Sequence, residues 1–119
     1  MNERIKESLL QIIDSAKRVG SYIEGMEASA FLKDERTQYA VAMNLIIIGE
    51  RARNLAKHHE TFVRQHPRVP WRLMAGMRNV IAHDYDALDL NVVWETITIS
   101  LPELRQMISA ILTESGEAS

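Results

Sequence analysis

The 119-residue sequence contains no cysteine, which excludes disulfide bonds and thiolate metal sites and is typical of proteins in the reducing cytosol. It also has no run of about 18 or more uncharged apolar residues, so no membrane-spanning helix is expected. The N-terminal residues Met1–Arg4 lead straight into an amphipathic pattern, which leaves no room for a signal peptide. We therefore expect a cytoplasmic protein that does not associate with a membrane.

The composition is that of a globular domain, with 46% hydrophobic and 25% charged residues. A chain of 119 residues is long enough for one domain with a core and too short for two. The net charge of −2 argues against nucleic acid as a partner, but the charge is unevenly distributed. Residues 51–78 contain seven Arg or Lys and one acid, and the rest of the chain contains seven bases and fifteen acids. A solvated helix face or a binding surface would explain this basic segment.

Apolar residues recur at helical spacing over residues 5–23 and again over residues 35–57, which predicts two helices. Residues 29–34 indicate a short helical turn or a tight connection between them. Gly49 costs about 1 kcal/mol relative to alanine in a helix, so its place on the buried stripe indicates that another backbone passes close. The predicted stripe of the second helix consists of Val41, Ala42, Leu45, Ile48, Gly49, Ala52, Leu55 and Ala56.

Two further helices are predicted in the second half of the sequence. Pro67 and Pro70 mark a break before a short helix over residues 71–83. Asp89 is the expected N-cap of the last helix, and Pro102 should kink that helix because it lacks a backbone donor. The buried stripe of the short helix is expected to contain Leu73, Met74, Met77 and Ile81, and Trp71 and Trp94 are expected in the core.

No segment alternates apolar and polar residues as an exposed strand would, so the sequence predicts an all-α bundle of four main helices. It should form a single domain over residues 1–113, with a frayed tail at residues 114–119. The second and fourth helices are apolar over wide arcs, at residues 46–48 and 92–94. One small bundle does not bury that much apolar surface easily, so we expect a homodimer.

The segment Met77–Asp86 concentrates an arginine, an asparagine, a histidine and a tyrosine at the end of the third helix. Asn79 and His83 are four residues apart and share one helix face, whereas Arg78 and His83 are about 140° apart around the axis. A two-fold symmetric dimer would bring two such motifs together, which favours a site at a subunit interface.

An imidazole and a fixed guanidinium are sufficient for RNA cleavage without a metal. The histidine would take the proton of the 2′-hydroxyl, and the arginine would stabilise the charge that develops on the phosphate. The sequence contains no P-loop or dinucleotide fingerprint, and His58, His59 and His66 lack convincing metal-ligand spacing, so no cofactor or metal is expected.

Structural roles also explain these residues. Arg78 and His83 would complement the helix dipole near a C-terminus, for about 0.3–1 kcal/mol each. Tyr85 would be a half-buried packing residue. Glu50 is either a solvent-facing charge or a partly buried acid paired with an arginine.

Four separated landmarks in this order resemble the HepT-like toxins of the HEPN superfamily, over nearly the whole chain. Residues 40–50, which end in Gly49-Glu50, resemble the second-helix signature of that family. The segment Val69-Pro70-Trp71 resembles the start of its third helix, and residues 78–85 fit its Arg-x4-His-x-Tyr motif without a gap. Leu101-Pro102-Glu103-Leu104 is similar to the Leu-Pro-x-Leu of its last helix.

The resemblance implies a four-to-five-helix up-down bundle of the HEPN type that forms a homodimer with a composite active site. It implies a type VII-like toxin, a metal-independent endoribonuclease with Arg78 and His83 as the catalytic pair and Asn79 assisting them. Tyr85 would be AMPylated by the antitoxin, an MntA-like minimal nucleotidyltransferase, and Glu50 would have a supporting role. RNA or the antitoxin would bind the basic residues, namely Arg51, Arg53, Lys57 and Arg72.

A non-catalytic alternative is also open. In that interpretation the helical dimer is a scaffold for a nucleotidyltransferase, and the motif is its docking surface or a nucleotide pocket.

Overall fold

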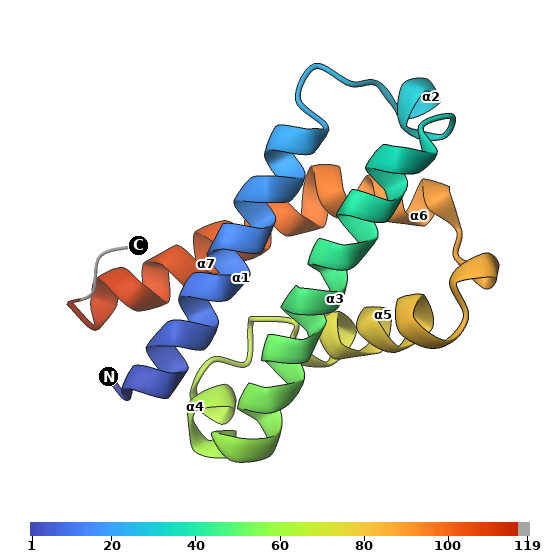
Figure 1. Cartoon of the computed structure of the whole chain (residues 1–119). Coiled ribbons are helices and arrows are strands. Elements are labelled where there is room, and N and C mark those ends of the chain that lie inside the picture. Colours follow the sequence, from blue (N-terminus) through green and yellow to red (C-terminus); the bar gives the residue numbers. More distant parts are fainter. Residues whose placement is uncertain (117–119) are drawn as a thin grey trace.

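The computed structural model describes residues 1–116, and these residues form helices, turns and loops without any strand (Figure 1). The all-α prediction is therefore confirmed for the described part of the chain. In order, the elements are α1 (Glu3–Tyr22), α2 (Ala28–Phe31), α3 (Glu35–His58), α4 (Glu60–Gln65), α5 (Trp71–His83), the 3-10 turn η1 (Tyr85–Ala87), α6 (Leu90–Glu95), the π-helical turn η2 (Thr96–Ser100) and α7 (Leu101–Glu114).

Side-chain caps start three of the helical stretches. The Asn2 side chain accepts hydrogen bonds from the backbone at the start of α1, and Asp34 accepts one from the backbone N–H of Thr37 at the start of α3. Asp89 accepts one from the backbone N–H of Asn91 at 2.9 Å, which confirms its prediction as the N-cap of the last stretch. Each cap satisfies a donor that the first helical turn leaves without a partner.

The long helices pack in antiparallel pairs around one core. Arg18 near the end of α1 hydrogen-bonds Asn44 in the first half of α3, so α1 and α3 run in opposite directions. The start of α1 and the end of α7 lie at the same end of the molecule and share a hollow (Figure 1). The core contains fully buried side chains from α1, α2, α3 and α7, including Leu9, Ile12, Phe31, Val41, Leu55, Ile108 and Leu112.

The last helical stretch runs from Leu90 to Glu114 and changes its hydrogen bonding at η2, immediately before Pro102. The backbone N–H of Leu101 bonds the carbonyl of Thr96, five residues earlier. Proline has no N–H to give to the carbonyl four residues before it, so a looser turn at this point relieves the conflict. A kink was predicted at Pro102; the structure has the π-helical turn Thr96–Ser100 ahead of this proline.

Some details of the sequence prediction are wrong. Leu73 was expected in the buried stripe of the third helix but is 76% exposed, and Ala56 is also exposed. Apolar periodicity predicts that a helix has a buried face but does not fix its edges. The buried face of α5 contains Trp71, Met74 and Ile81. The sequence pattern did not predict α4. Of the expected frayed tail at residues 114–119, Glu114 ends α7 and residues 117–119 lie outside the described residues. Within residues 1–116, no helix is both long and apolar enough to cross a membrane.

Candidate functional site

The motif of residues 78–85 starts on the side of α5 that packs against α3, and a glycine makes this packing close. A Cβ added at Gly49 would lie 2.3 Å from the Arg78 Cβ and 2.6 Å from the Met74 carbonyl oxygen. Carbon atoms normally come no closer than about 3.5–4.0 Å, so a side chain at residue 49 would push the two helices apart. The prediction that another backbone passes close to Gly49 is confirmed.

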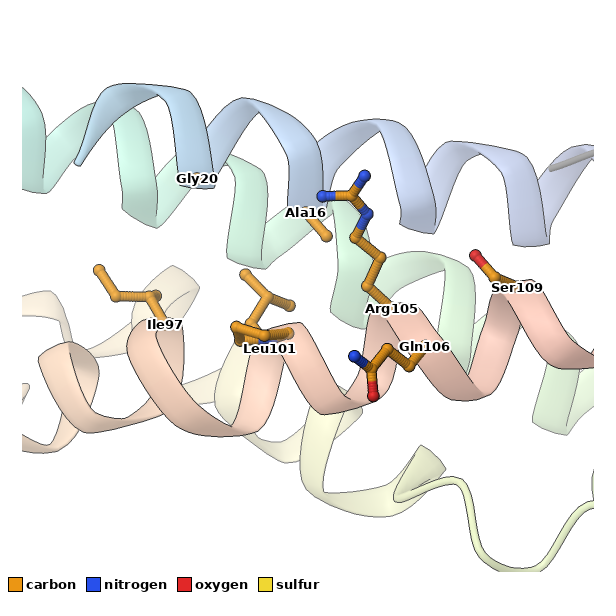
Figure 2. A pocket seen from close by; sticks show the side chains of 8 residues that line it. Ala16, Gly20, Ile97, Leu101, Arg105, Gln106 and Ser109 are labelled. Atoms are coloured by element: carbon orange, nitrogen blue, oxygen red, sulfur yellow. The ribbon is translucent and has the colours of Figure 1, made fainter. Parts of the chain in front are cut away.

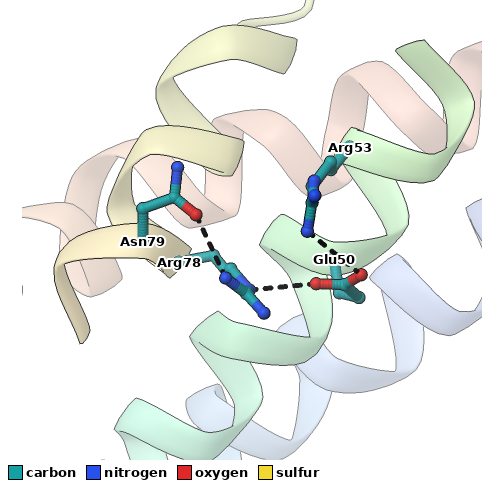
Figure 3. A network of polar contacts seen from close by, with 4 residues as sticks. All are labelled: Glu50, Arg53, Arg78 and Asn79. Carbon is teal, nitrogen blue, oxygen red and sulfur yellow. Dashed lines mark hydrogen bonds and ion pairs between the residues drawn. The ribbon is translucent and has the colours of Figure 1, made fainter. Parts of the chain in front are cut away.

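Glu50, the next residue of α3, forms an ion pair with Arg78 of α5 (Figure 3). The Arg78 Nε and the Glu50 Oε2 are 2.9 Å apart, and the side chains are 21% and 34% exposed. Both atoms are buried and neither has a partner in hydrogen-bond geometry, so the contact is an ion pair without an aligned hydrogen bond. Of the two environments considered for Glu50, the structure has the partly buried acid paired with an arginine.

Two more side chains complete this cluster (Figure 3). The Nη1 of Arg78 donates a hydrogen bond to the Oδ1 of its neighbour Asn79 at 3.1 Å. The Nη1 of Arg53 lies 3.9 Å from the Glu50 Oε1, and the Arg53 side chain is 55% exposed. The structure therefore brings together four predicted site residues, with two positive charges and one negative charge among them.

His83 does not join this cluster. It is the last residue of α5 and is exposed, and within the described part of the chain its imidazole has no hydrogen bond or ion pair. At 3.6 residues per turn, its position is about 140° around the helix from that of Arg78, which faces α3. Asn79 and His83 are both exposed on the side of α5 away from the core. One chain thus presents its guanidinium and its imidazole in different directions.

Tyr85 lies just beyond α5, in the 3-10 turn η1, and its hydroxyl is enclosed. Its ring packs against the ring of Tyr39 in α3, with 5.3 Å between the ring centroids. The hydroxyl oxygen is buried and has no hydrogen-bond partner among the described residues. Burial raises the pKa of Tyr85 above its ordinary value, and the nearby Tyr39, Glu35 and Asp86 add to this effect. The hydroxyl oxygen is therefore kept out of contact with solvent, and its ionised form is disfavoured.

The predicted basic segment is divided between different surfaces. Arg51 faces α1 and lines a hollow of about 310 Å³ together with Arg4 of that helix. Arg53 points to the Glu50 cluster, as described above, and Arg64 pairs with Glu60 within α4. Two other predicted residues, Lys57 at the end of α3 and Arg72 at the start of α5, are exposed. The segment forms no single basic face.

A hollow of about 470 Å³ between α1 and the stretch formed by η2 and α7 contains none of the predicted site residues in its lining (Figure 2). Arg105 extends from α7 toward α1 across this hollow (Figure 2). Among residues 1–116 there is also no group of three or more His, Asp or Glu side chains placed to hold a metal ion.

Sequence reasoning missed Tyr39, the ring that covers Tyr85. Residues 39 and 85 are far apart in the sequence, and Tyr39 itself is 54% exposed, so no buried-stripe pattern identifies it. The antiparallel packing of α3 and α5 brings the two tyrosines together.

Comparison with known proteins assigns the family. Residues 12–111 match the family model described as ribonuclease HepT-like. A Thermococcus cleftensis protein named "Probable ribonuclease HepT" is 34% identical over 105 residues, which cover 88% of this chain and 93% of that protein. A Methanocaldococcus jannaschii protein named as a putative RNase is 30% identical over 114 residues, or 95% of this chain and 92% of that protein. No solved structure matches at a significant level. The chain belongs to the ribonuclease HepT-like family.

Proposed function

We propose that this member of the ribonuclease HepT-like family is a metal-independent endoribonuclease, the toxin of a type VII-like toxin–antitoxin module that acts in the cytoplasm. In this proposal the active form is a homodimer, and each of its sites combines Arg78 and Asn79 with His83. The family match and the names of the relatives support the ribonuclease activity. The geometry of α5 supports the composite site.

The single observation that carries the proposal is the division of the motif between two sides of α5. Arg78 is held on the side facing α3 and is hydrogen-bonded to Asn79, while His83 is exposed on the outer side. The same outer side carries Leu73 and Val80, which are 76% and 45% exposed. Exposed apolar residues on one helix face are typical of a protein interface. A two-fold axis near this face would bring the two motifs together.

The residues suffice for cleavage by transesterification. His83 takes the proton of the 2′-hydroxyl while its oxygen forms a bond to the adjacent phosphorus. The bond from phosphorus to the 5′-oxygen breaks, and the His83 of the second copy gives that oxygen a proton. The products are a 2′,3′-cyclic phosphate and a 5′-hydroxyl. Arg78 stabilises the negative charge on the non-bridging phosphate oxygens, and Asn79 keeps the guanidinium in place through its hydrogen bond.

Tyr85 is the proposed site of control by a minimal nucleotidyltransferase antitoxin. The phenol oxygen would attack the α-phosphorus of ATP, form a phosphodiester to AMP and release pyrophosphate. The added phosphate, two residues from His83, would repel RNA and obstruct the groove. Because the hydroxyl is buried and the ring packs against Tyr39, η1 must move outward before the transfer. An unpartnered buried hydroxyl costs about 1–3 kcal/mol, which favours such an opening.

The test is cleavage of RNA by the purified, unmodified protein in EDTA, with detection of 2′,3′-cyclic phosphate ends. His83→Ala and Arg78→Ala should each lower the rate by at least about 100-fold while helicity by circular dichroism is unchanged. The control His58→Ala changes an exposed histidine at the end of α3 and should cleave normally. Full cleavage by either motif variant would overturn the assignment. A wild-type protein that binds a nucleotidyltransferase and cleaves no RNA would instead be the non-catalytic scaffold.

A further inference from the structure

We infer that Glu50 is the positioning residue for Arg78, and that the Gly49-Glu50 pair of α3 sets the direction of the guanidinium. The inference rests on the proposed function, because it concerns how the arginine meets a phosphate. Glu50 lies on a different helix from the motif, and Arg78 is the motif residue with which its carboxylate pairs. Its role would therefore act through Arg78.

The guanidinium of Arg78 is held at two of its three nitrogens. Glu50 approaches Nε at 2.9 Å from α3, and Asn79 accepts a hydrogen bond from Nη1 at 3.1 Å within α5. An arginine side chain otherwise has about 2 kcal/mol of rotamer entropy to lose when it binds an anion. Two contacts from two helices fix the plane of the group in advance. The Nη2 nitrogen and the second proton of Nη1 then remain for a phosphate, which prefers such a two-point contact.

Gly49 explains how a carboxylate on α3 reaches Nε, the nitrogen nearest to the α5 backbone. Because residue 49 has no side chain, the Arg78 Cβ can lie 2.3 Å from the position that a Cβ on residue 49 would occupy. The base of the arginine is therefore pressed against α3, and the next residue supplies the carboxylate. The two residues work together: Gly49 lets Arg78 approach α3 closely, and Glu50 forms the ion pair with it.

The charges of the cluster fit an anion as the missing partner. Glu50 carries one negative charge and faces two guanidinium groups, Arg78 at 2.9 Å and Arg53 at 3.9 Å. The cluster therefore keeps one positive charge. A phosphodiester group brings one negative charge, so its binding at the free edge of Arg78 would balance the cluster without displacing Glu50. The carboxylate orients Arg78 and does not cancel its charge.

The test compares Glu50→Ala and Glu50→Gln with a matched control, Glu60→Ala, which breaks the Glu60–Arg64 ion pair of α4. The substrate is an RNA oligonucleotide that the wild-type protein cleaves, under single- and multiple-turnover conditions. A guanidinium that is free to move should lower kcat in Glu50→Ala by about 10- to 100-fold, with KM changed by less than about threefold. Glu50→Gln keeps the length of the side chain and removes its charge; because the contact is an ion pair without an aligned hydrogen bond, this variant should recover less than half of the loss on a logarithmic scale. Glu60→Ala should match the wild type.

The double variant Glu50→Ala/Arg78→Ala separates positioning from an independent role. Because Glu50 acts through Arg78, the double variant should cleave at the rate of Arg78→Ala alone. A wild-type kcat in Glu50→Ala, or a further loss in the double variant, would overturn the inference while leaving the proposed function intact. Full activity of Arg78→Ala would instead overturn the proposed function, and the inference with it. Thermal unfolding of each variant identifies a loss of activity that comes only from unfolding.

Discussion

Replacing Gly49 by alanine tests how closely α3 and α5 pack, and the size of the effect follows from the structure. The new Cβ would lie 2.3 Å from the Arg78 Cβ and 2.6 Å from the Met74 carbonyl oxygen, so the helices must separate by about 1 Å to reach normal contact. Overpacking usually costs about 1–3 kcal/mol, and these neighbours cannot move without the backbone, so we expect the upper value. Alanine is a better helix former than glycine by about 1 kcal/mol.

The net result should be a loss of about 2 kcal/mol in the free energy of unfolding, and a fall of about 8 °C in Tm. Urea denaturation followed by far-UV circular dichroism measures this loss. Gly20→Ala is the matched control, because Gly20 is an exposed helical glycine in α1 with no atom within 4 Å of its ideal Cβ. It should gain up to about 1 kcal/mol. A Gly49→Ala protein as stable as the wild type would refute the close approach of the two helices.

Three further predictions concern Tyr85, Asp34 and the outer face of α5. The raised pKa of Tyr85 means that its contribution to stability is present below pH 10.0 and is lost as the pH rises through the folded-state value. Tyr85→Phe should therefore flatten the alkaline fall in unfolding free energy, and it should gain up to about 1 kcal/mol at neutral pH by removing an unpartnered hydroxyl; a steeper alkaline fall would contradict this. The backbone and hydroxyl of Thr37 lower the pKa of the Asp34 carboxyl, so its contribution is present above pH 3.8 and is lost as the pH falls through the folded-state value. Asp34→Asn should keep the cap and lose this acid dependence in urea titrations below pH 3.8, and an unchanged acid limb would argue against the assignment. Leu73→Asp should turn the proposed dimer into a monomer in light scattering and lower RNA cleavage at least tenfold, whereas Ile99→Asp, which changes a 55% exposed residue of η2, should do neither.

Much of the fold could be predicted because it depends on local patterns. The bounds of α1, α3 and α5 follow from apolar periodicity together with caps and prolines, which act within one helical turn. The short α4 escaped prediction because six residues are too few to display a period. Leu73 was assigned to the wrong side because α5 has apolar residues at its edge, and periodicity alone does not say which of them meets the core.

The candidate site could be predicted as a list of residues and not as an arrangement. The angle between Arg78 and His83 depends only on helix geometry, so the sequence already indicated that one chain would not pair them. The sequence does not decide whether Glu50 faces solvent or forms an ion pair, because the answer depends on which helix crosses α3 at Gly49.

By itself the sequence determined where the long helices α1, α3 and α5 begin and end, and which chemical groups the motif carries, since these properties are settled within a few residues of each position. Only the tertiary structure decided that Arg78 is held by Glu50, that the Tyr85 ring packs against Tyr39 with its hydroxyl buried, and that the basic segment is divided between surfaces. Each of these depends on the antiparallel packing of α3 with α5 or of α1 with α3. Such contacts join residues far apart in the chain, so they depend on how whole helices pack together and not on the local sequence.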